Sequence, residues 1–83
     1  MGLRKRFEAI QIREKRFGYF PQRFRWHGRD YIVSRVERCW TVKRRRWGGH
    51  VEQHCFRVHC GDSVYDVIQD LIGNTWHIQS VRS

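Results

Sequence analysis

The residues best suited to chemistry lie in the middle of the chain, in the run W-T-V-K-R-R-R-W-G-G-H. Lys43, Arg44, Arg45 and Arg46 can pair with successive phosphates, while Trp47 offers a flat face on which a base can stack. Each stacked base contributes about 1 to 3 kcal/mol, and any base can stack. The same residues also fit a hairpin tip whose charges are solvated and whose Trp47 folds back over the core. The stretch therefore predicts either a polyanion-binding site or a plain hairpin tip.

A second group of arginines surrounds the turn that follows Trp26. Alternation along a strand places Arg23 and Arg25 on one face, and Arg29 follows the turn. The opposite face carries Phe24 and Trp26, whose large rings we expect in the core. These arginines would continue the phosphate-binding surface if the strands before and after the turn form a hairpin.

The overall charge favours a polyanionic partner. The 83 residues carry a net charge of +9, and residues 1–60 hold 16 of the 17 Lys and Arg side chains. Of all 17 cations, 14 are arginines, whose planar guanidinium group binds phosphate and stacks on rings. We expect one small domain over residues 1–83, in which residues 1–6 form a flexible basic arm.

Compartment signals predict a cytoplasmic location and no membrane partner. The N-terminus lacks the apolar segment of a secretory signal, and no stretch approaches the length of a membrane span. The three cysteines, Cys39, Cys55 and Cys60, are an odd number. An odd number fits reduced thiols better than a disulfide framework.

The pairs His54-Cys55 and His59-Cys60 invite a zinc-binding interpretation, which a strand would rule out. Five residues at about 3.3 Å each separate the thiols by roughly 16 Å and place them on opposite faces, whereas two thiolates on one zinc ion lie within about 4 Å. A cysteine nucleophile needs a positioned base, which adjacent His and Cys on a strand do not supply. We therefore expect no metal, no cofactor and no enzymatic activity.

Short segments rich in Val, Ile, Phe, Tyr and Trp alternate with turn residues, which is typical of an antiparallel meander. The breaks include His27-Gly28, Gly61-Asp62 and Gly73-Asn74. The predicted fold is all-β, either a strongly curved sheet or a partly open barrel of the SH3-like kind. The six expected strands cover residues 7–13, 23–26, 29–41, 53–60, 63–72 and 75–82.

Alternation within these segments also predicts the core. In residues 29–41, Ile32, Val36 and Trp40 would share one buried face. Further expected core positions are Phe56, Val58, Trp76 and Ile78.

Residues 63–72 fit two structures. As a strand they would turn Tyr65, Val67 and Leu71 inward, whereas Val64, Val67, Ile68 and Leu71 also recur at helical spacing. Periodicity alone therefore leaves both the strand and the helix open for this segment.

Several motifs resemble a family of small bacterial proteins. The most specific is W-x-G-R-x-Y-x-V, which begins at Trp26, and the runs V-Y-D-V-I-Q-D from Val64 and W-H-I-Q-S-V from Trp76 follow in the same order. The match covers residues 7–82. A similar domain occurs at the C-terminal end of polymerase-like mutagenesis proteins related to the Y-family translesion polymerases. The resemblance implies a compact β domain, a strand in residues 63–72 and a setting in DNA damage tolerance, and it implies no reaction.

Together these features predict a non-enzymatic domain that binds nucleic acid with little sequence preference. No element able to read base edges in a groove is recognisable. Single-stranded DNA or RNA suits neighbouring arginines and aromatics better than a duplex does. The alternative is a protein-interaction module, in which an open edge strand or a tryptophan surface docks a polymerase or another replication or repair protein. The choice between DNA and RNA and the oligomeric state stay open.

Overall fold

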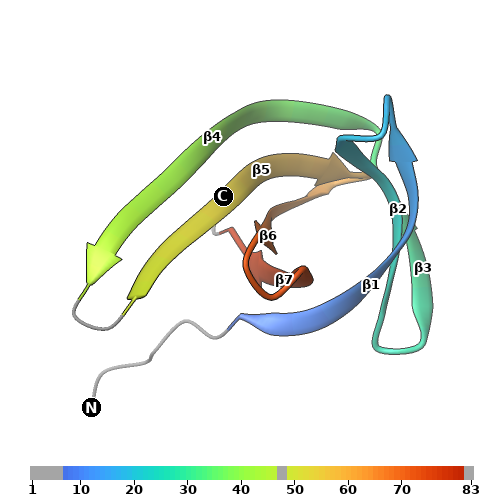
Figure 1. Cartoon of the computed structure of the whole chain (residues 1–83). Coiled ribbons are helices and arrows are strands. Elements are labelled where there is room, and N and C mark those ends of the chain that lie inside the picture. The colour runs from blue at the N-terminus through green and yellow to red at the C-terminus, as the bar shows by residue number, and fades with distance from the viewer. Residues whose placement is uncertain (1–6, 47–48, 82–83) are drawn as a thin grey trace, which may run out of the picture.

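The fold is one antiparallel β-sheet. The computed structural model describes residues 7–46 and 49–81, and none of these residues is helical. The predicted all-β, strongly curved sheet is confirmed, with seven strands in the order β3-β2-β1-β7-β6-β5-β4 (Figure 1). The strands are β1 (Glu8–Arg16), β2 (Phe20–Trp26), β3 (Arg29–Ile32), β4 (Arg35–Arg46), β5 (Gly49–Cys60), β6 (Ser63–Asp70) and β7 (Thr75–Ser80).

The expected basic arm in residues 1–6 and the side chain of Trp47 lie outside the described residues. Within residues 7–46 and 49–81, no helix has the length and apolar character needed to cross a membrane.

Tight turns form at two of the expected breaks. The turn between β2 and β3 contains His27 and Gly28, whose φ angles are 52° and 74°. Two left-handed residues make a type I′ turn, whose twist matches that of the flanking strands. Between β5 and β6, Gly61 is left-handed with φ 63° and Asp62 is not, as in a type II′ turn. The sequence signals for these hairpins were therefore reliable.

The chain crosses from one edge of the sheet to the other between β3 and β4. The Val33 N–H donates to the Gln22 carbonyl of β2 at 2.9 Å, and the next N–H, that of Ser34, donates to the His59 carbonyl of β5 at 2.8 Å. Adjacent residues can bond to β2 and to β5 only because the sheet curls until its edges approach here (Figure 1). The sheet is therefore a half-barrel, and the predicted strand over residues 29–41 is divided in two.

This division changes which residues of that segment are buried. Ile32 is 64% exposed, and Val36 is half-buried against the core. Between Val36 and Arg38 the pairing register shifts, and Trp40 then pairs with Cys55 on the face opposite the core. A β-bulge adds one residue and so reverses the alternation of faces. The prediction that Ile32, Val36 and Trp40 share a buried face is wrong.

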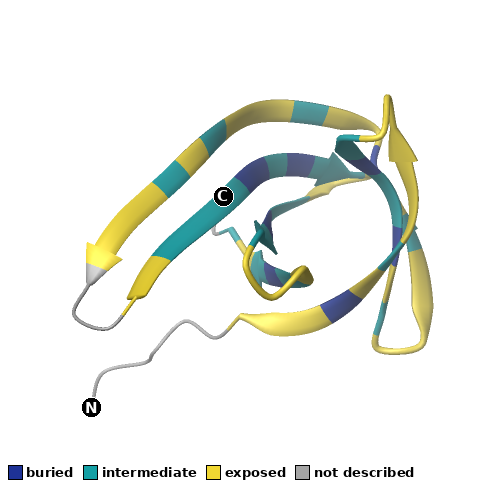
Figure 2. Ribbon diagram, viewed as in Figure 1, coloured by how far each residue is buried: buried dark blue, intermediate teal, exposed yellow. Residues whose placement is uncertain are grey.

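The main core fills the concave side of the sheet. Phe24, Phe56, Val58 and Ile78 are fully buried, although β2 is not a neighbour of β5 in the sheet. Such side chains meet only inside a curved sheet. Figure 2 shows buried positions along the middle of β5, β6 and β7 and mainly exposed ones along β4. The predicted burial of Phe56, Val58 and Ile78 is confirmed, and Trp76 packs half-buried beside them.

β6 spans Ser63–Asp70, so the helical alternative for this segment is wrong. Val67 and Ile68 are both buried although consecutive strand residues face opposite sides. Val67 belongs to the concave core, whereas Ile68 pairs with Cys55 on the convex face. Apolar residues on both faces of this strand imitate the spacing of a helix.

Candidate nucleic-acid interface

β4 is the most strongly charged of the described strands and forms one edge of the sheet. Its 12 residues include six Lys or Arg side chains and a single carboxylate, that of Glu37. β4 pairs with β5 along nearly its whole length, and the β4–β5 hairpin extends away from the other strands (Figure 1). Because no other described strand pairs with β4, its far rim is open to a ligand.

The predicted cations at the end of β4 are divided between two rows. Pairing with β5 places Lys43 and Arg45 on the concave side and Arg44 on the convex side. Arg46 is the last residue of the strand, and Trp47 lies beyond the described part. The two rows lie on either side of the edge of β4 that pairs with no other described strand, which we call the rim. A polyanion that runs along the rim can therefore contact the cations of both rows. A polyanion lying across either face alone meets only alternate residues.

The convex face of β4 carries an aromatic ring beside two guanidinium groups. The Cζ atom of Arg38 lies 4.8 Å from the ring centroid of Trp40, and that of Arg57 lies 6.0 Å from it. Arg57 donates two hydrogen bonds to Asp66, at 2.8 and 3.1 Å, and this ion pair raises the pKa of Arg57. Arg38 forms no ion pair within the described residues, so its charge stays available.

Arg38 and Trp40 are site residues that the sequence prediction missed. Their signal is the alternation of Arg38, Trp40, Val42 and Arg44, which places a ring and two cations at every second position of one strand. The bulge before Arg38 hides this pattern, because counting from Val36 assigns Trp40 to the core.

An apolar hollow of about 490 Å³ lies beside Trp40 on the convex face. Its buried floor is Cys55 and Ile68, whose relative exposures are 5% and 8%. Burial raises the pKa of the Cys55 thiol, so this side chain acts as a small apolar group. The other residues around the hollow are Phe7, Val42, Arg44, Val51, Gln53 and Asp66.

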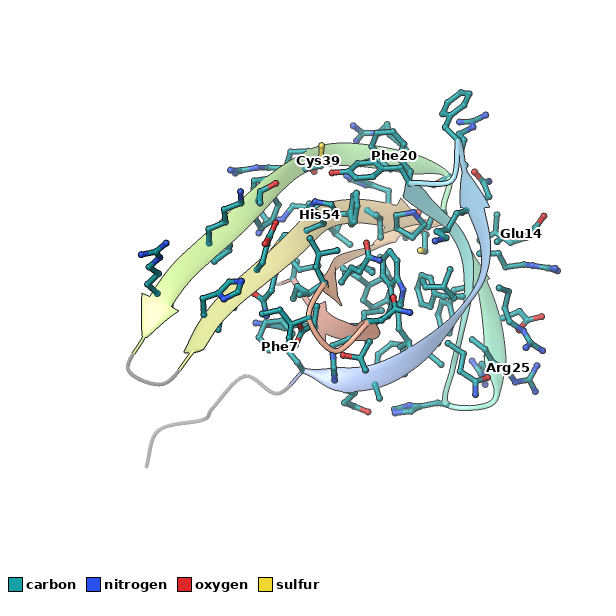
Figure 3. The ribbon with its side chains drawn as sticks, in the orientation of Figure 1. Phe7, Glu14, Phe20, Arg25, Cys39 and His54 are labelled. Carbon is teal, nitrogen blue, oxygen red and sulfur yellow. The ribbon has the colours of Figure 1, made fainter. Side chains whose placement is uncertain are left out.

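The second predicted cluster lies away from β4. Arg23 and Arg25 share a face of β2 as predicted, opposite Phe24 and Trp26. Arg23 Nε lies 3.1 Å from Glu14 Oε1, and Arg25 donates to Asp30 at 3.3 Å. Figure 3 shows Glu14 and Arg25 on the outer side of β1 and β2.

Arg29 is exposed at the start of β3. Because β2 and β3 lie at the edge opposite β4, the structure does not join this cluster to Lys43, Arg44 and Arg45.

A carboxylate, that of Glu37, offsets part of the positive charge at the start of β4. The His59 Nε2–H donates to Glu37 Oε1 at 2.7 Å, and Arg35 Nη2 lies 3.1 Å from the same nitrogen. The hydrogen bond from His59 lowers the pKa of Glu37 below its usual 4.5. Glu37 is therefore ionised at neutral pH and offsets one cation at this end of the strand, whereas the far end keeps a larger excess of positive charge.

The cysteines and histidines of β5 are spread over both of its faces. Cys55 lies on the convex side with Trp40, and Cys60 packs against the concave core. Among residues 7–46 and 49–81, no three His, Cys, Asp or Glu side chains are close enough to hold a metal ion.

We expect a thiol reagent such as dithionitrobenzoate to modify Cys39 quickly at neutral pH and the other two cysteines slowly. Cys39 is exposed, whereas burial raises the pKa of the Cys55 thiol and brings that of Cys60 to about 11. The thiolate is the reactive form. Absorbance of the released thionitrobenzoate measures the rates, and urea should make all three cysteines reactive. A fast phase that persists in Cys39→Ser would contradict this assignment.

Comparison with known families places nearly the whole chain in one of them. A family model described as Domain of unknown function (DUF6504) matches residues 3–82. No curated protein and no solved structure matches the chain.

Proposed function

The chain belongs to the DUF6504 family, a domain family of unknown function, and from this premise we propose that it is a non-enzymatic nucleic-acid-binding accessory domain. The observation that carries the proposal is the charge of β4, an edge strand with six cations and one carboxylate. Arg38, Arg44 and Arg45 form no ion pair within the described stretches, so each can contact a phosphate without losing a protein partner. Their contacts supply affinity without reading the sequence of the nucleic acid.

Single strands fit this surface better than a duplex. Trp40 lies beside Arg38, and a guanidinium that stacks on a ring keeps its N–H edge free for phosphate. The exposed rim of β4 is the edge of one extended strand, whereas the major groove of a duplex admits a helix or a two-stranded ribbon. A flexible single strand can follow such a line, and its bases remain available for stacking.

The resemblance of residues 7–82 to the C-terminal domain of polymerase-like mutagenesis proteins supports a setting in DNA repair or translesion synthesis. In that setting the partner is single-stranded DNA exposed near a lesion, and the compartment is the cytoplasm. An accessory domain there needs affinity for the strand and no sequence preference.

Fluorescence anisotropy of labelled single-stranded DNA across a salt series tests the proposal. The logarithm of the binding constant should fall linearly with the logarithm of the salt concentration, because binding releases counterions from the nucleic acid. Arg44→Ala/Arg45→Ala should make the slope shallower by about 1.4, because each lost contact with a single strand contributes about 0.7.

The matched control is Arg13→Ala/Lys15→Ala, which removes two exposed cations from β1 and should leave the slope unchanged. The proposal fails if the native chain does not bind at roughly 50 mM salt, where screening is weak. It also fails if both variants change the slope equally.

A second candidate function rests on the backbone of β4. An edge strand of 12 residues exposes unpaired N–H and C=O groups along its rim, on which an extended segment of a polymerase or repair protein can add as a further strand. This docking uses the main chain, whereas nucleic-acid binding uses the side chains. Removing the arginines should therefore spare the docking and abolish the binding.

A further inference from the structure

Phe17 occupies a position that neither the turn nor the core explains. It is 87% exposed, more than any other large apolar side chain of the described residues. Its φ of 55° lies in the left-handed region, where Asn, Asp and Gly are usual. With Gly18 it forms a turn closed by a hydrogen bond from the Tyr19 N–H to the Arg16 carbonyl at 3.0 Å. Holding a phenylalanine there costs of order 1 kcal/mol and buries little of its ring.

A cavity of about 580 Å³ lies beside this ring, between the β1–β2 turn and the start of β4. Figure 3 shows Phe20 and Cys39 at this end of the sheet, and both side chains line the cavity. The volume lies within the range of about 300 to 1,000 Å³ that is typical of small-ligand sites. Arg16, Phe17 and residues 20–22 form one wall, and residues 33–39 form the other.

The charges around the cavity favour an anion. Three arginines line it, Arg16, Arg35 and Arg38, against one carboxylate, that of Glu37. Glu37 already accepts a hydrogen bond from His59 at 2.7 Å. The Arg16 Cζ lies 5.9 Å from the centroid of the Phe17 ring, so a cation and an exposed ring stand together at the entrance.

We infer that this cavity binds one unstacked base of a single-stranded nucleic acid. The base stacks on Phe17, and Arg35 and Arg38 hold its neighbouring phosphates. This inference rests on the proposed function and extends it, because Arg38 belongs both to the cavity and to the charged rim of β4. A strand that follows the rim thus reaches the cavity without leaving the protein.

The combination of ring and charge selects this ligand over other anions. Every nucleotide carries a flat ring and a phosphate, so each unit of a single strand satisfies both Phe17 and the arginines. The carboxylates of an acidic peptide can pair with the arginines, but most of its residues have no flat ring to stack on Phe17. A duplex keeps its bases stacked and offers no ring to Phe17.

The variant Phe17→Asn separates binding from folding. Asparagine suits a left-handed turn position, so the thermal midpoint of unfolding should not fall. Affinity for a short oligothymidylate should fall by about 5- to 150-fold, the loss of one stacked base. The salt slope should stay the same, because no charge is removed.

A matched control and a local signal accompany this variant. Ile72→Asn removes another exposed apolar side chain, 57% exposed, from a different turn, and should leave the affinity unchanged. The oligothymidylate should also slow the reaction of Cys39 with dithionitrobenzoate in the native chain, since Cys39 lines the cavity. In Phe17→Asn, at equal saturation, this protection should weaken.

The outcomes distinguish this inference from the proposed function. If the native chain binds and Phe17→Asn binds equally well, the cavity is not a base site and the proposed function stands. If the native chain does not bind at all, both fail. If oligothymidylate affinity is unchanged but binding to phosphatidylglycerol vesicles requires Phe17, the ring contacts a membrane surface and the inference is overturned.

Discussion

Reversing three cations of β4, in the variant Arg38→Glu/Arg44→Glu/Arg45→Glu, will lower affinity for single-stranded DNA by at least about a thousandfold. Each charge-assisted hydrogen bond contributes roughly 1.5 to 3 kcal/mol, so three lost contacts account for about 4.5 kcal/mol or more. The new carboxylates also repel the phosphates. Fluorescence anisotropy at low salt, with circular dichroism to confirm folding, measures this loss.

The control for charge reversal changes the same number of charges elsewhere. Arg13→Glu/Lys15→Glu/Arg29→Glu alters three exposed cations of β1 and β3, on the other half of the sheet. We expect a modest loss, because the net charge falls equally while the β4 contacts survive. Equal losses in the two variants would show that binding follows net charge or the β2–β3 cluster, and would contradict a site on β4.

Replacing Phe56 by alanine will lower the free energy of unfolding by about 3 to 5 kcal/mol, the usual loss for a buried phenylalanine. A chain of this length is stabilised by roughly 4 to 12 kcal/mol in total, so the variant will lose at least about a quarter of its stability and, at the lower end of that range, will be unfolded. The side chain is fully buried at the centre of the concave core. The rings of Tyr19, Phe20 and Trp76 pack around it, with centroids 5.2, 5.9 and 6.1 Å away.

Urea denaturation followed by tryptophan fluorescence measures this change, and Ile32→Ala is its control. Ile32 is 64% exposed, so its replacement should change the free energy of unfolding by less than about 0.5 kcal/mol. A loss of 2 kcal/mol or more in Ile32→Ala, as expected for a core residue, would place Ile32 in the core and contradict the division of the segment into β3 and β4.

The cations of β4 also have a structural role that is compatible with binding. A long edge strand can pair with other chains and aggregate, and charged side chains along the edge prevent this. The two roles differ in what they require. Charge of either sign can keep the edge strand from pairing with other chains, whereas binding of phosphate needs positive charge. The reversed variant should therefore remain soluble while losing affinity.

Local patterns in the sequence located a strand in each of the six predicted segments and part of the core, although they joined β3 and β4 into one strand over residues 29–41. Phe56 and Val58 alternate within one strand, and Gly28 and Gly61 occupy turns whose φ angles are positive. These features depend on neighbours a few residues apart, which a single sequence displays directly. The helical alternative for residues 63–72 arose because Val67 and Ile68 are buried on opposite faces of β6.

The candidate site was predictable only in part. The sequence singled out Lys43, Arg44 and Arg45, and the structure places them on an exposed edge strand, away from the arginines of β2 and β3. Arg38 and Trp40 escaped prediction because the bulge after Val36 shifts them to the other face. A one-residue change of register leaves no mark on composition or spacing, although it moves every later side chain to the opposite side.

By itself, the sequence determined that this protein is a small, strongly basic β-sheet with its excess of positive charge in residues 1–60, because composition, alternation and turn residues act locally. Only the tertiary structure decided that β4 is an edge strand, that Trp40 faces away from the core, and that Phe17, Arg35 and Arg38 line the same cavity. Those facts follow from the order of strands and the curl of the sheet. Both depend on pairing between segments far apart in the chain, which no local pattern records.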